Sequence, residues 1–284
     1  MNVVRHFSPV FVVWLLATVH LRGGTYRFEP SADARIITYG GGGLDTQNYA
    51  TDILSVYTAT NNANLQRTLI QFDLSGIVLA GNERVGSAIL TLVASTAYGG
   101  NPGQPMEVYR VLAPWNERTL TWLQRDANIP WGTPGSDFLG EGGEAYATST
   151  NAPATGQQVS WDVTRLVDEW VEQATPNYGL LLRSYNGNGL TFVQRESPDT
   201  NSHPALTVIS ALGVPRLKAA MDQTSGQLVL SWRGVGFAVL QESAGIAGNA
   251  SWSDSSLVVT PQGQVSVVNV NPSPGQRFFR LRSP

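Results

Sequence analysis

Three arginines and one tyrosine have the residue types and spacing that could bind an acidic ligand. Arg183 and Tyr185 occupy alternate positions of a strand-like run, so both side chains point to the same side. The opposite side of that run is more apolar and should face a core; it carries Leu180, Leu182 and Ser184. If neighbouring strands bring Arg35 and Arg195 to the same outer surface, the four side chains form one basic groove with an aromatic wall. A guanidinium group meets a carboxylate with two parallel donors, so such a groove suits an acidic sugar.

The same arginines have a second interpretation, in which they brace the sheet through salt bridges. Arg195, for instance, could pair with Glu196 or Asp199. Under that interpretation the guanidinium groups are already neutralised, and they form no binding surface. Substitution of Arg183 and Arg195 by alanine distinguishes the two interpretations, because only the first requires both residues for binding.

Tryptophans around a polar connection form another candidate binding site. Trp131 follows Trp115 and Trp122 in a segment that also contains Glu117. Exposed tryptophan rings could stack on sugar rings, which makes Trp131 a candidate ligand-binding residue. The interpretation that we favour for the group is packing beneath a long loop.

A glycine-flanked loop offers oxygen donors for a metal ion. Asp45, Asn48 and Asp52 supply the carboxylate and amide oxygens that calcium accepts, although their spacing does not follow the EF-hand pattern. The loop therefore predicts a possible structural calcium site, and an ordinary Asx-rich turn is the alternative. No other cofactor is indicated.

Few residues suit catalysis. The sequence contains no cysteine, which excludes thiolate chemistry and a disulfide framework. A Ser-His-Asp relay would depend on His203, because His6 and His20 lie in the N-terminal segment. Paired carboxylates of a glycosidase could form only through the fold, from Glu117, Glu141, Glu144, Glu169 and Glu196. We therefore expect a non-catalytic protein, with a polysaccharide hydrolase or lyase as an open alternative.

Most elements that would position these residues are short strands. In residues 26–210, runs with period-two alternation are separated by Gly, Asn, Pro and Asp, and no βαβ alternation occurs. This pattern predicts an all-β fold, an antiparallel jelly-roll-like sandwich. One amphipathic helix is expected over residues 160–172, capping one end of the sandwich. Its apolar stripe consists of Val163, Leu166, Val167, Trp170 and Val171.

Length and composition predict two modules. The 284 residues suffice for one large β domain, over residues 25–210, and a small β-sandwich module, over residues 216–284. A net charge of -3 argues against binding to nucleic acid or to an anionic membrane. Residues 1–24 combine a charged start with an apolar run too short for a stable membrane span, as in a signal peptide. A retained anchor is the alternative. We expect a secreted or cell-surface protein.

Six motifs of the larger module occur in the order found in a known family. They are 31–36 (SADARI), 67–75 (RTLIQFDLS), 87–92 (SAILTL), 115–122 (WNERTLTW), 161–164 (WDVT) with Trp170, and 195–197 (RES) before 203–206 (HPAL). In this order they resemble the DNRLRE-type module, which is related to the disaggregatase repeat. Some members of that family are carbohydrate-binding modules for acidic polysaccharides such as alginate. Residues 230–232, 239–243 and 278–281 resemble a small C-terminal module of secreted bacterial proteins, which could provide association with a cell surface.

The resemblance implies a β-sandwich, export, and glycan binding without catalysis. Combined with the arginines, it predicts a secreted carbohydrate-binding protein for a polysaccharide, more specifically an acidic (uronate) one. The alternative is a structural or adhesive protein of the cell surface or matrix that binds no sugar. Most motif residues should belong to the framework; a core is predicted for Phe72, Leu90, Leu92, Trp161 and Trp170.

Overall fold

The computed structural model describes most of the chain from residue 23 onward. The described ranges are 23–40, 43–51, 53–61, 63–97, 104–140, 142–151, 153–173, 175–185, 187, 189–234, 236, 238–246, 250–263, 265–273 and 275–284. The predicted signal peptide lies almost wholly outside them. Within these ranges, no helix has the length and apolar character required to cross a membrane.

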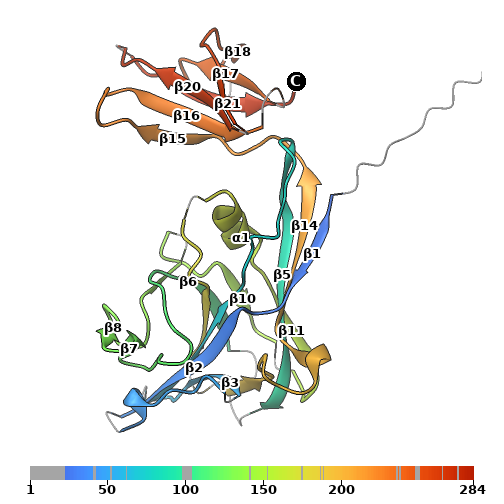
Figure 1. Ribbon diagram of the computed structural model, residues 1–284, viewed down its shortest axis with the longest axis vertical. Coiled ribbons are helices and arrows are strands. Elements are labelled where there is room, and N and C mark those ends of the chain that lie inside the picture. Colours follow the sequence, from blue (N-terminus) through green and yellow to red (C-terminus); the bar gives the residue numbers. More distant parts are fainter. Residues whose placement is uncertain are drawn as a thin grey trace, which may run out of the picture.

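The larger part of the structure is an antiparallel β-sandwich (Figure 1), as the alternation predicts. Its strands are β1 (Thr25–Phe28), β2 (Ala32–Tyr39), β3 (Leu54–Thr58), β4 (Asn64–Gln71), β5 (Glu83–Ala97), β6 (Met106–Val111), β7 (Gln124–Asp126), β8 (Ile129–Pro130), β9 (Phe138–Leu139), β10 (Ala147–Ser149), β11 (Gln158–Asp162), β12 (Leu180–Ser184), β13 (Gly189–Phe192) and β14 (Ala205–Leu212). The helices are α1 (Thr164–Val171) and two short 3-10 turns, η1 (Gly43–Thr46) and η2 (Thr200–Ser202).

Two layers of strands enclose the main core. In one layer β1 pairs with β14, β14 with β5, and β5 with β11. In the other, β4 lies between β2 on one side and β3 and β12 on the other, and β12 continues to β6 and β10. β13 joins the layers by pairing with both β3 and β5. The buried residues between the layers include all five predicted core residues: Phe72, Leu90, Leu92, Trp161 and Trp170.

The helix is shorter than its sequence pattern indicates. α1 begins at Thr164, and residues 158–162 form strand β11 against β5 instead. In β11 Val159 and Trp161 are buried while their neighbours are exposed, so the two-residue alternation of a strand overrides the helical start. The predicted apolar stripe is nevertheless correct, because Leu166, Val167 and Trp170 all pack into the main core. α1 lies at the end of the sandwich nearest the C-terminal part (Figure 1).

A second core covers one outer face of the sandwich. The connection from residue 112 to residue 140 packs against the outward side of β2, β4 and β12. Leu181 is therefore fully buried, although the alternation of its strand assigns it to the outer side. The buried members of this cluster are Ala34, Ile36, Leu69, Val111, Leu120, Trp122, Trp131 and Leu181.

The C-terminal residues form a small sandwich of two sheets. One sheet has the order β15-β16-β20-β19, and the other has the order β18-β17-β21. Leu230, Trp232, Leu240, Val268 and Val270 form the core between them. The strands are β15 (Lys218–Met221), β16 (Leu228–Arg233), β17 (Val239–Ser243), β18 (Ser253–Asp254), β19 (Thr260–Gln262), β20 (Val265–Val270) and β21 (Phe278–Arg282).

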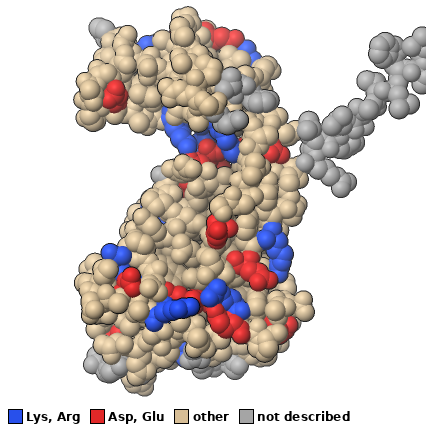
Figure 2. Space-filling view, viewed as in Figure 1, with Lys and Arg blue, Asp and Glu red and all other residues tan. Residues whose placement is uncertain are grey.

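Charged side chains join the two sandwiches. Figure 2 shows acidic and basic side chains gathered where the two parts meet. Glu172, directly after α1, is 5% exposed and accepts a 2.6 Å hydrogen bond from the guanidinium of Arg233 in β16. Arg216 contacts Asp168 on α1 at 3.3 Å. The end of the helix is thus the point where the smaller sandwich is held.

Candidate binding groove

Two neighbouring arginines line a groove on the outer face of the larger sandwich. Arg67 lies on β4 and Arg183 on the adjacent β12, and Tyr185 directly follows β12. The groove has a volume of about 140 Å³ and is lined by Thr58, Leu65, Arg67, Arg183, Ser184 and Tyr185. It lies on the same face as the second core, beside Gly135 and Phe138 of the covering connection.

Aromatic rings hold both guanidinium groups in place. The guanidinium carbon of Arg67 lies 4.8 Å from the ring centre of Trp122 and 5.0 Å from that of Phe138. That of Arg183 lies 4.2 Å from the ring centre of Tyr185, whose hydroxyl accepts one of its N–H groups. Such cation–π contacts fix the planes of the guanidinium groups before any ligand arrives.

A glycine brings the main chain close to Arg67. The Nη1 group of Arg67 donates to the carbonyl oxygen of Gly135, which has a φ of +89°. A Cβ atom at this position would lie 2.6 Å from the Arg67 Nη1 atom and 2.6 Å from the ring of Trp122. The covering connection therefore needs glycine here to pass over the arginine.

The groove carries a net positive charge. Burial, and next the charge of Arg183, lowers the pKa of Arg67 from 12.5 to about 10, so Arg67 is still charged at neutral pH. Arg183 pairs with the carboxylate of Glu107, with 4.0 Å between Nε and Oε2. Among the described residues, no carboxylate lies within 4.0 Å of Arg67. Of these two partly desolvated cations, only Arg183 has a carboxylate within 4.0 Å among the described residues, which favours binding of a further carboxylate.

The four predicted groove residues do not form a single groove. Arg183 and Tyr185 meet as expected, but Arg35 points to the opposite side of the sheet. Its neighbours on β2, Ala34 and Ile36, pack into the second core, so alternation turns Arg35 away from it. There it lies over the ring of Tyr49, at 5.0 Å from the ring centre.

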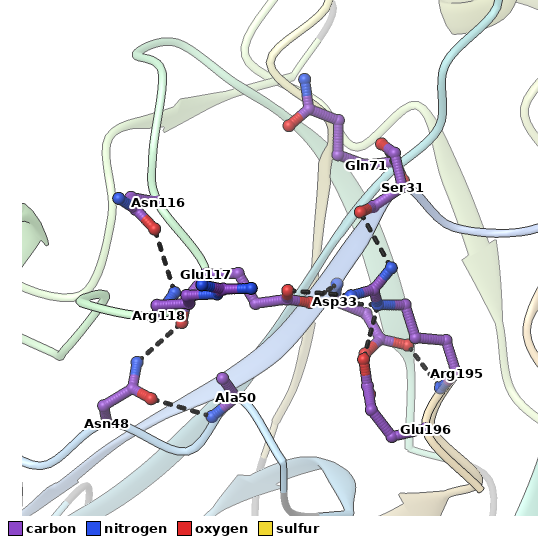
Figure 3. Close-up of polar contacts among 10 residues, drawn as sticks. All are labelled: Ser31, Asp33, Asn48, Ala50, Gln71, Asn116, Glu117, Arg118, Arg195 and Glu196. Atoms are coloured by element: carbon purple, nitrogen blue, oxygen red, sulfur yellow. Dashed lines mark hydrogen bonds and ion pairs between the residues drawn. The ribbon is translucent and has the colours of Figure 1, made fainter.

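Arg195 belongs to a separate acidic cluster beside β2 (Figure 3). Its Nη2 group donates to Glu117 Oε2 at 3.0 Å, and its Nε group lies 2.6 Å from Glu196 Oε1. Its main-chain N–H donates to Asp33 Oδ2 at 3.0 Å. Glu196 was the partner anticipated by the salt-bridge interpretation. The prediction that Arg195 lines the basic groove is thus wrong, because its guanidinium is already paired with two carboxylates.

Asp33 is the most perturbed acid of this cluster. It is fully buried on β2, and its main-chain N–H donates to Glu117 Oε1 at 2.8 Å. Burial raises the pKa of Asp33 from 3.8 to about 7, and the charges of Glu196 and Glu117 add to this effect. The hydrogen bond from the main chain of Arg195 partly opposes it.

Comparison with protein families shows to which family the larger sandwich is related. Residues 46–208 match the model of the disaggregatase related repeat domain. The chain belongs to this family. The match spans more than half of the chain and confirms the resemblance inferred from the motifs, although it does not extend to the smaller sandwich. No curated protein matches the sequence.

The disaggregatase-related repeat contains the whole basic groove, since Arg67, Arg183 and Tyr185 all lie within residues 46–208. Asp33 and Arg35 precede the matched region. The acidic cluster therefore combines Glu117, within the repeat, with a strand contributed from outside the match.

The predicted tryptophan site is not exposed. Trp131 is 4% exposed and Trp122 6%, and both pack in the second core. The Nε1 group of Trp131 donates to the carbonyl oxygen of Thr121 at 3.2 Å. Trp131 thus has no open ring face for stacking on a ligand, and the favoured interpretation, packing beneath the long connection, is the observed arrangement.

The predicted calcium loop is only partly within the described residues, because Asp52 lies outside them. Asn48 forms an Asx turn, in which its Oδ1 atom accepts the N–H of Ala50 at 3.2 Å. Its Nδ2 group donates to the carbonyl oxygens of Glu117 and Leu120, at 2.8 and 2.7 Å. Asp45 keeps a buried Oδ1 atom without a hydrogen-bond partner among the described residues. Asn48 thus follows the turn interpretation.

Among the candidate catalytic residues, Glu169 and His203 have structural partners. Glu169 accepts a hydrogen bond from the hydroxyl of Tyr146 at 2.8 Å. The Nε2 atom of His203 lies 2.8 Å from the carbonyl oxygen of Ser197, not at a serine hydroxyl. Glu141 lies outside the described residues, and Glu144 is exposed.

Sequence reasoning missed Arg67 and Asp33. For Arg67 a signal exists, because residues 67, 69 and 71 alternate with the core residues Ile70 and Phe72 and so face outward with Leu181. For Asp33 the position on a strand was visible, but its partners come from segments more than 80 residues away in the sequence.

Proposed function

We propose that this disaggregatase-related repeat binds an acidic polysaccharide at the Arg67–Arg183 groove, without catalysis. The observation that carries the proposal is the pair of adjacent guanidinium groups held by aromatic rings, of which only Arg183 has a carboxylate within 4.0 Å among the described residues. Two fixed guanidinium forks are suited to the carboxylate of a uronate residue.

The shape of the groove limits what part of a polymer it can take. A volume of about 140 Å³ is below the several hundred Å³ typical of sites that enclose a small molecule. The groove therefore holds the carboxylate edge of one sugar residue, and the rest of the polymer lies outside it. Tyr185, which is half-buried, offers a ring beside that edge.

A non-catalytic role is supported by the accessibility of the acidic groups. The group with the most perturbed pKa among the described carboxylates, Asp33, is fully buried. Glu117 and Glu196 are held by Arg195, so neither is free to protonate a glycosidic oxygen or attack a sugar. A polysaccharide hydrolase or lyase remains the alternative, and release of soluble oligosaccharide from a labelled polymer is the observation that would establish it.

The setting proposed for this binding is extracellular. The N-terminal sequence has the pattern of a signal peptide, and a family related to carbohydrate-binding modules suits a secreted or cell-surface protein. The smaller sandwich would then connect the sugar-binding repeat to the surface. A structural protein that binds no sugar is the competing proposal.

Affinity electrophoresis tests the proposal. Gels containing a uronate polymer are expected to retard the wild-type protein, whereas gels with a neutral polymer are not. Gels with a sulfated polymer separate carboxylate recognition from general attraction to anions. Loss of an arginine–carboxylate pair of about 1.5–3 kcal/mol should weaken uronate binding roughly ten- to one-hundred-fold in Arg183→Gln.

Arg27→Gln is the matched control, because it removes the same charge from the exposed edge strand β1. It should keep wild-type retardation. Equal retardation of wild-type protein and Arg183→Gln by the uronate polymer would exclude the groove as the site. No retardation by any of the three polymers would favour the structural protein.

A further inference from the structure

We propose that the carboxylates of Asp33, Glu117 and Glu196 bind one calcium ion, at a site separate from the arginine groove. The proposal does not depend on sugar binding. Figure 3 shows the three carboxylates pointing toward one another around the guanidinium of Arg195. One oxygen of each carboxylate lies within 4.8 Å of one oxygen of each of the others, which is the span of two Ca²⁺–O bonds of about 2.4 Å.

The three ligands come from distant parts of the chain. Asp33 lies on β2, Glu117 in the covering connection before β7, and Glu196 in the segment after β13. The hydrogen bonds from Asp33 N to Glu117 Oε1 and from Arg195 N to Asp33 Oδ2 hold them in register. A bound ion would therefore tie together three segments that the strands alone do not pair.

Asp33 provides an independent indication of a missing ligand. Its side chain is fully buried, and its Oδ1 atom has no hydrogen-bond partner among the residues that the structure describes. A buried carboxylate oxygen without a partner is costly, and native proteins seldom leave one unsatisfied. A cation in contact with this oxygen removes that cost.

Arg195 does not supply the missing partner. Its guanidinium donates to Glu117, at 3.2 and 3.0 Å, and to the carbonyl oxygen of Ser31, at 3.1 Å, and it lies 2.6 Å from Glu196. Only its main-chain N–H reaches Asp33, at the other oxygen. With all three acids ionised, one guanidinium leaves two negative charges uncompensated, which a divalent cation balances.

The cluster can be reached from solvent. The side chain of Glu196 is 31% exposed and that of Glu117 is 16% exposed. Ser31, beside the cluster, also lines a cavity of about 490 Å³. Calcium takes 6–8 oxygen ligands in a flexible geometry, so water can complete the shell left by three carboxylates. Magnesium demands a near-ideal octahedron at about 2.1 Å and fits this irregular set less well.

Calcium titration of the full chain tests the site. Protein stripped with EDTA and titrated with CaCl₂ by calorimetry should bind one ion at the cluster. At free calcium about one hundred times the dissociation constant, the thermal midpoint should rise roughly 5–10 °C above that in EDTA. MgCl₂ at the same concentration should give a smaller rise, and an equal rise would overturn the assignment to calcium.

Glu196→Gln is the diagnostic variant, since its partly exposed side chain can change without disturbing the core. It should lose both the calcium heat and the thermal shift. Asp45→Asn is the matched control, because Asp45 belongs to the neighbouring loop predicted from the sequence, and it should keep both. Binding retained in Glu196→Gln, or lost only in Asp45→Asn, would overturn the proposal. So would the absence of any calcium effect on the wild-type protein, which would leave a proton as the partner of Asp33.

Calcium binding and sugar binding can fail separately. Arg183→Gln should bind calcium like the wild-type protein, because Arg183 lies on the other side of the sheet from Asp33. Loss of calcium binding in Arg183→Gln would contradict the separation of the two sites. Uronate binding unaffected by Glu196→Gln would agree with it.

Discussion

The buried carboxyl of Asp33 should make the stability of the metal-free protein fall as the pH rises. A pKa raised from 3.8 to about 7 means that the folded state binds this proton more tightly than the unfolded state. The stabilisation is complete below about pH 4 and is lost as the pH rises through about 7. At about 1.4 kcal/mol per pKa unit, the total is about 4 kcal/mol, of which about 2.5 kcal/mol falls between pH 5 and pH 8.

Other acids act in the opposite direction and in a lower pH range. Hydrogen bonds hold the pKa of four aspartates below the usual value, so their contribution is lost only as the pH falls below about 4. They are Asp73, Asp126, Asp222 and Asp254. The interval between pH 5 and pH 8 therefore isolates Asp33 from them.

Urea unfolding in EDTA at pH 5, 6, 7 and 8 measures this effect. The free energy of unfolding of Asp33→Asn should vary less with pH than that of the wild-type protein, by about 2.5 kcal/mol over the range. The neutral amide can still accept the N–H of Arg195, and the groups facing this position, Glu117, Glu196 and Arg195, are the same in both proteins. Parallel pH profiles for the two proteins would refute the assignment.

Three substitutions test the framework around the sites. Glu172→Gln leaves the charge of Arg233 unpaired at the junction and should cost roughly 3 kcal/mol, with the smaller sandwich melting earlier in calorimetry; a single unchanged transition would contradict this. Leu166→Ala, at a fully buried position of α1, should lower the free energy of unfolding in urea by about 3 kcal/mol, and a loss below about 1 kcal/mol would show that the helix does not cap the core. Gly179→Ala places a Cβ atom 2.5 Å from the carbonyl oxygen of Ile70 at a φ of +86°, and this clash should lower the thermal midpoint. A midpoint equal to that of the wild-type protein would disprove the close contact before β12.

Local alternation predicted the fold and half of the binding groove. The two-residue period of the strands gives the antiparallel sandwich, and the stripe of α1 gives its buried face. Arg183 and Tyr185 meet because they occupy alternate positions of one extended segment. These features depend on residues close together in the sequence, and so the sequence alone is sufficient for them.

The remaining features depend on long-range placement. Alternation separates the two sides of a strand, but it does not say which side a distant loop covers. For this reason the alternation of β12 puts Leu181 on an outer surface, whereas the connection from residue 112 to residue 140 buries it. The register between β2 and β4 pairs Arg35 with Thr68 and turns its side chain to the other side of the sheet from Arg183. This register cannot be read from the sequence of either strand, so Arg35 was expected beside Arg183. The acidic cluster likewise appears only when three distant segments meet.

Calorimetric titration with a uronate oligosaccharide and with its carboxyl-reduced form tests the central claim most directly. Reduction replaces each carboxylate by a hydroxymethyl group and leaves the rest of the sugar in place. The wild-type protein should bind the uronate form at least about ten-fold more tightly, and Arg183→Gln should lose that preference. Equal affinity of the wild-type protein for the two forms would contradict recognition of a carboxylate by Arg67 and Arg183.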